Sequence, residues 1–250
     1  MFLKACINKQ LLKISGNPVT FNDLEYYVAM LRDSMPYSFS RFGDGEWSAV
    51  LGRTGANCDG HDYFPALGAD LRRALFERLG YFYGLQTKAL KNMGRAIYRF
   101  LRRNNVKIVW HDSDIFHYCN TAGTLFPLIR QLRRMKVVLI GPKRLKGLNG
   151  VVFDYDHFIE IPLQNCYLVK DAVIGRIKEH YRDRGPALFG FSASMATNVM
   201  IHELFPLLGS TSWLLDFGSL WDAYVGFDSR GGKSGDQWNA IMKRNLGEHA

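Results

Sequence analysis

The apolar positions of this chain follow helical and strand periods in turn. In residues 24–32 apolar side chains recur every three or four positions, and Thr20 with Asp23 resembles a capping box at the start of a helix. The same spacing predicts further helices at residues 46–51, 67–79, 88–103, 124–133, 169–181 and 193–204. Short apolar runs predict strands at residues 38–42, 106–110, 137–140, 158–161, 187–191 and 213–216. This alternation indicates βαβ units, and therefore an α/β fold with a mainly parallel sheet flanked by helices.

The length of the chain bears on the number of domains. A chain of 250 residues with 47% hydrophobic content can bury a core of its own. We expect a single domain over residues 1–250, in which residues 226–250 form a C-terminal extension. The glycines of segment 231–235 predict a hinge before a last helix.

Cysteine spacing and the N-terminal segment bear on the compartment. The four cysteines lie far apart with no C-x-x-C pair, which indicates neither a zinc knuckle nor a disulfide framework. Residues 1–15 mix lysines with apolar residues, unlike a signal peptide, and no stretch approaches the roughly 18 apolar residues of a membrane span. We therefore expect a cytoplasmic protein, with a peripheral position at the membrane as the alternative.

The net charge of +9 favours anionic partners through long-range attraction. Basic residues gather in four patches, at residues 72–78, 99–107, 130–136 and 143–146, and acids are sparse between residues 70 and 140. Solvated helix faces account for many such runs. The alternative is binding to an anionic surface, either phospholipid headgroups with a lipid-linked acceptor or a nucleic acid backbone.

The most informative polar segment is Arg41-Phe42-Gly43-Asp44-Gly45-Glu46, which follows a predicted strand. An extended or turning backbone would point Asp44 and Glu46 the same way, while Gly43 and Gly45 would let a ligand approach. Such carboxylate pairs suit Mg²⁺ or Mn²⁺, whose remaining positions are filled by water and substrate phosphates. Arg41 could bind those phosphates. The alternative is a glycine-rich turn with surface acids.

A second polar group follows the strand predicted at residues 106–110. His111, Asp112 or Asp114 could remove a proton from a hydroxyl group as a general base. The alternative is an Asx-rich cap on the next helix. The glycine-rich segment 52–65 is predicted to be a mobile loop that could close over a substrate.

Three further motifs point away from other enzyme classes. The segment 190–194 nearly matches the G-x-S-x-G turn of hydrolases, but it ends in serine and no suitable histidine follows. We interpret Ser192 and Ser194 instead as caps of a helix whose N-terminus faces phosphate. The Gly-Lys-Ser run at residues 232–234 lacks the frame of a P-loop, and no G-x-G-x-x-G follows a strand, so we do not expect NAD.

The segment 40–46 resembles the S-x-R-F-G-D-G-E signature of the GT-D glycosyltransferase family. The resemblance extends in order over roughly residues 37–225, through Ile140-Gly141-Pro142-Lys143-Arg144, Ile161-Pro162-Leu163-Gln164-Asn165-Cys166 and Leu215-Asp216-Phe217-Gly218. It implies a Rossmann-like fold, a nucleotide-sugar donor such as UDP-glucose, and Asp44 and Glu46 as ligands of a metal at the diphosphate. Many relatives have G-H after D-I, followed by an acidic and aromatic run. This chain departs from that pattern in residues 218–224, so the catalytic groups of that segment do not carry over.

The resemblance therefore implies a glycosyltransferase that uses Mn²⁺ or Mg²⁺ and moves a sugar from a nucleotide sugar, a UDP-hexose, to a hydroxyl group. The acceptor would be a glycan or a lipid-linked glycan. Asp112, His111 and Asp222 are the candidate bases. Residues that could bind the donor are Arg41, Gly43, Gly45, Lys143, Arg144 and Ser192.

Two alternatives to a glycan-directed enzyme stay open at this point. A glycosyltransferase acting on a modified DNA base would use the basic helices, with Tyr81, Phe82, Tyr83 and Trp110 supplying stacking contacts. A non-catalytic binding module would keep the fold without the chemistry.

Overall fold

The chain builds its core around one sheet, and the computed structural model describes residues 2–228, 231 and 235–248. The strands among these residues pair in parallel, in the order β1-β4-β3-β2-β8-β7-β5-β6. They are β1 (Val19–Thr20), β2 (Ser38–Phe42), β3 (Phe82–Leu85), β4 (Trp110–Asp112), β5 (Val137–Pro142), β6 (His157–Ile161), β7 (Leu188–Phe191) and β8 (Trp213–Asp216). Because parallel strands share one direction, their carboxyl ends meet at a single edge of the sheet.

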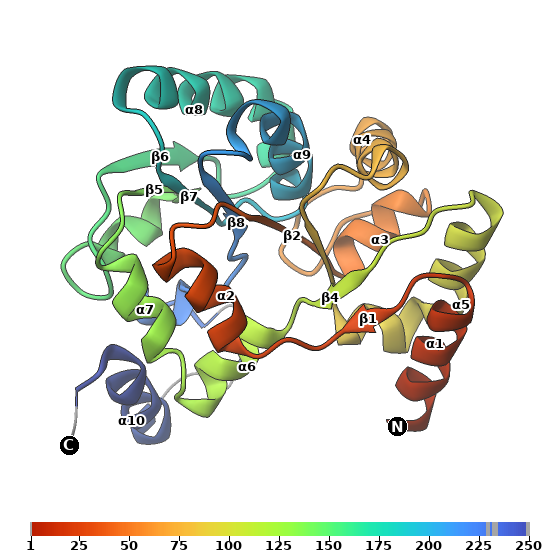
Figure 1. Cartoon of the computed structure of the whole chain (residues 1–250), viewed down its shortest axis with the longest axis horizontal. Coiled ribbons are helices and arrows are strands. Elements are labelled where there is room, and N and C mark those ends of the chain that lie inside the picture. The colour runs from red at the N-terminus through yellow and green to blue at the C-terminus, as the bar shows by residue number, and fades with distance from the viewer. Residues whose placement is uncertain (1, 229–230, 232–234, 249–250) are drawn as a thin grey trace.

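Helices cover both faces of this sheet (Figure 1). In β8, Leu214 packs with the apolar residues of α8 and α9, whereas Leu215 packs on the opposite face with those of α2 and α7. The helices are α1 (Phe2–Ile14), α2 (Leu24–Arg32), α3 (Asp44–Val50), α4 (Pro65–Glu77), α5 (Thr87–Arg103), α6 (Ile115–Ala122), α7 (Phe126–Leu132), α8 (Lys170–Arg184), α9 (Ala196–Leu208) and α10 (Gly235–Leu246), with 3-10 turns η1 (Lys143–Leu148), η2 (Cys166–Val169) and η3 (Asp222–Val225). The predicted α/β fold with a parallel sheet flanked by helices is confirmed.

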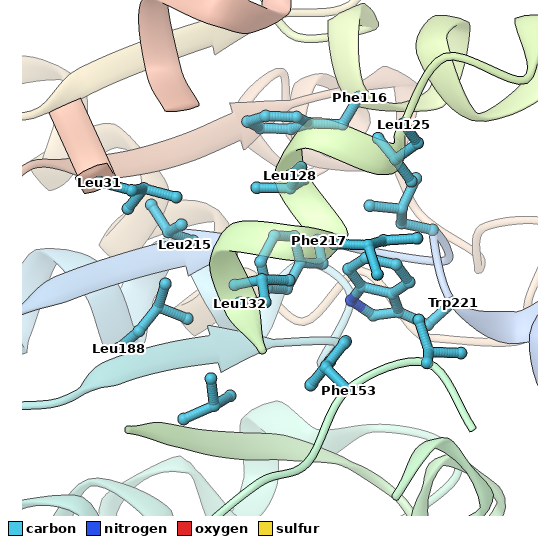
Figure 2. Close-up of a cluster of buried hydrophobic side chains, with 14 of the residues drawn as sticks. Leu31, Phe116, Leu125, Leu128, Leu132, Phe153, Leu188, Leu215, Phe217 and Trp221 are labelled. Atoms are coloured by element: carbon cyan, nitrogen blue, oxygen red, sulfur yellow. The ribbon is translucent and has the colours of Figure 1, made fainter. Parts of the chain in front are cut away.

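A cluster of fully buried side chains fixes the segment that follows β8 (Figure 2). Phe217 and Trp221 pack edge to face with ring centroids 5.3 Å apart, and Trp221 also contacts Phe153 at 5.2 Å. Phe217 and Trp221 lie between Asp216 and Asp222 in the sequence, so their packing holds both carboxylates in place at the edge of the sheet.

Several elements differ from the sequence prediction, and three of them do so for identifiable reasons. The strand expected at residues 106–110 begins at Trp110, because the side chain of Asn17 bonds the backbone of Val106 and Ile108 at 3.0 and 2.9 Å. Strand β3 was not predicted, since four residues between two helices are too few to show a period. Helix α1 was not predicted either, because lysines interrupt its apolar stripe.

Helix α10 packs against α6 and α7. The Asn245 side chain accepts a hydrogen bond from the Leu125 backbone N–H at 2.8 Å and donates one to the Asn120 carbonyl at 2.8 Å. The predicted hinge includes residues 232–234, which lie outside the described residues, and the assignment of one domain with an extension stays a prediction. Among the described residues, no helix combines the length and the apolar character that crossing a membrane requires.

Candidate active site

A cleft of about 630 Å³ opens at the carboxyl edge of the sheet. Its walls come from the segments that follow β2 through β8 and from the loop at residues 57–61. This edge is where open α/β sheets bind ligands. Its polar lining includes Arg41, Asp44, Glu46, His61, Gln86, Arg144, Ser192, Asp216 and Asp222.

The two carboxylates that follow β2 lie in the first turn of α3. Gly43 is the N-cap residue, and its backbone N–H donates to Glu46 Oε2 at 2.8 Å. Asp44 is the first helical residue, and its Oδ2 lies 2.9 Å from Lys88 Nζ on α5. Side chains two positions apart on a helix point in directions that differ by about 200° around the helix axis. The expectation that both carboxylates point the same way was therefore wrong, although both line the cleft.

A third carboxylate, Asp216, ends β8 beside the same turn. Its Oδ2 accepts a hydrogen bond from the Arg41 backbone N–H at 3.2 Å, and its Oδ1 accepts one from the Gly218 N–H at 3.0 Å. Burial raises the pKa of Asp216 to about 6, although the Arg41 charge opposes this rise. Burial also raises the pKa of Glu46 to about 7, and the nearby Asp216 contributes to that rise.

Asp216 is a site residue that was not predicted from the sequence. Its place in the Leu215–Gly218 segment of the resemblance, directly after a predicted strand, was the available signal. Its closeness to Glu46 depends on the pairing of β2 with β8, strands that lie far apart in the sequence.

Gly218 leaves room for the guanidinium group of Arg41. Its φ is +53°, and a Cβ added there would lie 2.6 Å from Arg41 Nη1. A side chain at this position would therefore push Arg41 away from the two carboxylates. Glycine is favoured at this φ and leaves free the space that the arginine occupies.

Several polar atoms at the cleft are buried without a hydrogen-bond partner among the described residues. They include Arg41 Nε, Gln86 Oε1 and Ser192 Oγ. Buried polar groups are normally paired, so such atoms in a cleft are suited to contacts with a polar ligand. These atoms include both hydrogen-bond donors and acceptors.

Arg144 and Asp222 both line the cleft and form an ion pair with each other. The Arg144 side chain donates to Asp222 Oδ1 at 3.2 Å, and Asp222 is buried. The neighbouring Lys143 is exposed and is not among the described residues that line the cleft. Of the two basic residues predicted to help Arg41, the structure thus brings Arg144 to the site and leaves Lys143 outside it.

The other two candidate bases lie apart from this cleft. His111 is buried, its ring stacks on Phe82 with centroids 4.3 Å apart, and its Nδ1 lies 2.9 Å from the Tyr27 hydroxyl. Asp112 Oδ1 accepts a hydrogen bond from the Asp114 backbone N–H at 3.0 Å, just before α6 begins. Neither residue is among the described residues lining the cleft. The N-cap residue of α6, Asp114, makes no side-chain capping bond, and its Oδ2 instead accepts from the backbone N–H of Thr87, the first residue of α5, at 2.9 Å. The predicted cap on the next helix was therefore wrong as well.

The aromatic residues considered for base stacking belong mostly to the core. Tyr81, Tyr83 and Trp110 are all buried, and the two tyrosine rings stack on each other with centroids 4.3 Å apart. The stacking role assigned to these three side chains in the nucleic-acid alternative was therefore wrong.

Hydrogen bonds hold the glycine-rich loop at residues 52–65 to Ser194 and Asn165. Asn57 Nδ2 donates to Ser194 Oγ at 3.2 Å, and His61 Nδ1 accepts from the Asn165 N–H at 3.0 Å. The side chain of Asn165, in turn, donates to Asp62 Oδ2 at 2.7 Å. Burial lowers the pKa of His61, a cleft residue that the sequence analysis treated only as part of a loop.

The serines that follow β7 do not cap α9. This helix begins at Ala196, and its N-cap residue Met195 makes no side-chain capping bond. Ser194 has a φ of +52° and instead accepts the bond from Asn57, while the buried hydroxyl group of Ser192 has no partner among the described residues. The predicted capping role was wrong, but Ser192 does line the site.

The acidic residues of the cleft fit a hard divalent cation. No cluster of three or more His, Cys, Asp or Glu residues arranged for a metal occurs in the described part of the chain. Magnesium and manganese, however, often take one or two protein carboxylates together with water and substrate phosphates. When Glu46 and Asp216 are both ionised, the guanidinium group of Arg41 balances one of their two charges, so a cation would suit this edge.

The fold is that of a known class of glycosyltransferase. No family model matches this chain, and neither does any curated protein sequence. Among solved structures, a glycosyltransferase (DUF1792) from Streptococcus sanguinis is 17% identical, with a TM-score of 0.62 over 82% of this chain and 83% of that one. A domain of unknown function 1792, described as having a distinct glycosyltransferase fold, is 15% identical, with a TM-score of 0.62 over 88% of this chain and 84% of that one. The fold expected from the GT-D resemblance is confirmed.

Proposed function

We propose that this chain is a glycosyltransferase that takes a hexose from a UDP-sugar and transfers it to a hydroxyl group of a glycan. One observation carries the proposal: on a glycosyltransferase fold, the cleft at the carboxyl edge gathers Arg41, Asp44, Glu46 and Asp216. An arginine beside several carboxylates suits a diphosphate that arrives with a divalent cation.

The residues of the cleft have distinct roles in donor binding. Arg41, held between Gly218 and the two buried carboxylates, would contact the diphosphate, with Arg144 on the opposite wall. Fixed positive groups at this place stabilise the negative charge that develops on the leaving nucleoside diphosphate. A divalent cation held by carboxylates of the cleft, among Asp44, Glu46 and Asp216, would supply further positive charge to the diphosphate.

Transfer requires that the bond between the sugar C1 and the diphosphate oxygen breaks while a bond from C1 to the acceptor oxygen forms. The proton of the acceptor hydroxyl group must then pass to a base. Asp222 is the candidate base that lines the cleft, and its ion pair with Arg144 fixes its orientation. The nucleoside diphosphate leaves with the electrons of the broken bond.

The test is the thermal stability of the protein against a panel of nucleoside diphosphates and nucleotide sugars, each with Mn²⁺, Mg²⁺ or EDTA. We expect one nucleotide to raise the melting temperature only when the metal is present. Asp44→Ala should abolish this shift, and Asp112→Asn should keep it. An absence of any shift in the wild type would favour the non-catalytic binding module.

A further inference from the structure

A chain of hollows leads from the donor cleft to a groove between α1 and α5. A small hollow of about 230 Å³ shares Asp44, Asn57 and Cys58 with the cleft. On its other side, this hollow shares Asn92 and other residues with a groove of about 510 Å³. The three spaces therefore lie side by side, and Asp44 lies between the small hollow and the cleft.

The walls of the groove are basic. They include Arg53, Lys91, Arg95 and Arg99, all exposed, and no carboxylate is among the described lining residues. None of these four forms an ion pair with a carboxylate in the described part of the chain. Positive charge without compensating acids is suited to an anionic ligand.

The charges on α5 form a row. Lys91, Arg95, Arg99 and Arg103 recur every four residues, and α5 contains no acidic residue. A helix rises 1.5 Å per residue, so this row extends over about 18 Å. A single phosphate would engage one end of such a row, whereas a chain with repeated charges would engage it along its length.

The floor of the groove favours sugars over nucleobases. Asn8 lies against Gly94, where an added Cβ would overlap its side chain, and this close contact holds α1 on α5. Asn92 is exposed and could bond hydroxyl groups. No aromatic side chain is among the described residues that line this groove, so it lacks the stacking platforms that single-stranded nucleic acids use.

We propose that the α1–α5 groove binds the acceptor, and that the acceptor is a glycan chain linked by phosphodiesters. Its phosphates lie along the row on α5, and its terminal hydroxyl group passes Asp44 into the cleft. This inference rests on the proposed function, because the groove acts as an acceptor site only if the cleft binds the donor.

The experiment measures binding of a fluorescent glycerol-phosphate oligomer by anisotropy over a range of salt concentrations. A thymidine oligonucleotide with the same number of phosphates and a neutral glucose oligomer serve as comparison ligands. The groove variant is Arg95→Glu/Arg99→Glu. Its matched control is Arg134→Glu/Lys178→Glu, which changes the net charge equally near α7 and on α8, away from the groove (Figure 1).

We expect the wild type to bind the glycerol-phosphate oligomer more tightly than either comparison ligand. Its affinity should fall as salt rises, with a log–log slope of about 0.7 for each phosphate engaged. The groove variant should bind at least about tenfold more weakly, which is the loss expected when repulsion replaces charge-assisted contacts. The control should stay within about twofold, because its charges lie on other elements and the screening by salt weakens charge interactions that act at long range. Metal-dependent UDP binding should be the same in all three proteins.

Three results would overturn the inference. Equal weakening in the groove variant and the control would show that the net charge, and not the groove, attracts the ligand. Tighter binding of the oligonucleotide would assign the groove to nucleic acid. A wild type that binds UDP but not the oligomer would refute the acceptor site alone, whereas one that binds the oligomer but no nucleotide would refute the acceptor role together with the proposed function.

Discussion

Two strand ends in the same sheet, those of β2 and β4, carry similar residues in very different surroundings. Both strands end at the carboxyl edge, and each is followed by acidic residues near a basic or titratable group. After β2, Asp44 and Glu46 line an open cleft. In the last two residues of β4, the ring of His111 is covered by Phe82 and bonded to Tyr27, and the Asp112 carboxylate bonds a turn. A position at the end of a strand is therefore not sufficient for a catalytic role.

The difference comes from what packs over each strand end. Gly43 and Gly45 bring the backbone of α3 to the cleft without side chains that would fill it. Over β4, α2 and the aromatic residues beside it close the space above His111. The contrast predicts that the same kind of substitution should impair activity at the first end and stability at the second.

The largest effect should come from removing a cleft carboxylate. Asp44→Ala and Glu46→Ala should each lower the rate of sugar transfer at least about a hundredfold, since they remove groups that organise the diphosphate. Asp112→Asn should leave the rate within about threefold, because that side chain acts in a turn. The measurement is donor turnover by the three purified variants. Circular dichroism shows whether each variant is folded. Equal losses in Asp44→Ala and Asp112→Asn would remove the contrast.

A smaller loss of donor affinity should follow from a substitution that displaces the Arg41 side chain without replacing it. Gly218→Ala places a methyl group within 2.6 Å of Arg41 Nη1. We expect it to weaken nucleoside diphosphate binding by about tenfold, or roughly 1.4 kcal/mol. Gly150→Ala is the matched control, because Gly150 also has a positive φ, of +73°, but an added Cβ meets nothing within 4 Å. Calorimetric titration of both variants is the measurement, and similar affinities would argue against a role for Arg41.

A substitution at the end of β4 should lower the stability of the protein rather than its activity. His111→Ala removes a buried ring that stacks on Phe82 and leaves the Tyr27 hydroxyl group without this partner. The free energy of unfolding should fall by about 2–4 kcal/mol. Urea denaturation measures this change, and donor binding by the protein that remains folded should be unchanged. A specific loss of transfer rate with full stability would instead restore His111 as a candidate base.

A further effect should appear in the pH dependence of stability without metal. The pKa of Asp216 is raised from 3.8 to about 6 by burial, so the folded state holds this proton more tightly than the unfolded state does. Stability should therefore decrease as the pH rises from about 4 to 6, by at most about 1.4 kcal/mol per pH unit from this group. Asp216→Asn should flatten the decrease. Urea denaturation in EDTA at several pH values provides the test, and identical profiles for the wild type and the variant would contradict the account.

Much of the fold could be predicted from the sequence because periodicity is a local property. The strands at residues 38–42 and 213–216 have the predicted bounds. The α2 stripe is buried, with Asp23 rather than Thr20 as the capping residue. Prediction failed where tertiary contacts replaced local signals, as at Asn17, whose side chain satisfies the backbone of residues 106–108.

The candidate site could be predicted in part. The segment 41–46 identified one wall of the cleft, because glycines beside carboxylates are a local signal. Asp216 and His61 required the strand order and the loop contacts, which no local pattern contains. The predicted direction of the Asp44 and Glu46 side chains was wrong because α3 begins two residues earlier than its apolar spacing indicated.

The most direct test of the central claim is calorimetric titration of UDP-glucose into the wild type, Asp44→Asn and Asp112→Asn, with Mn²⁺ and then with EDTA. The account predicts binding by the wild type and Asp112→Asn in Mn²⁺, and its loss both in EDTA and in Asp44→Asn. Binding that is equal in all three proteins and unaffected by EDTA would contradict a metal-assisted donor site at the end of β2.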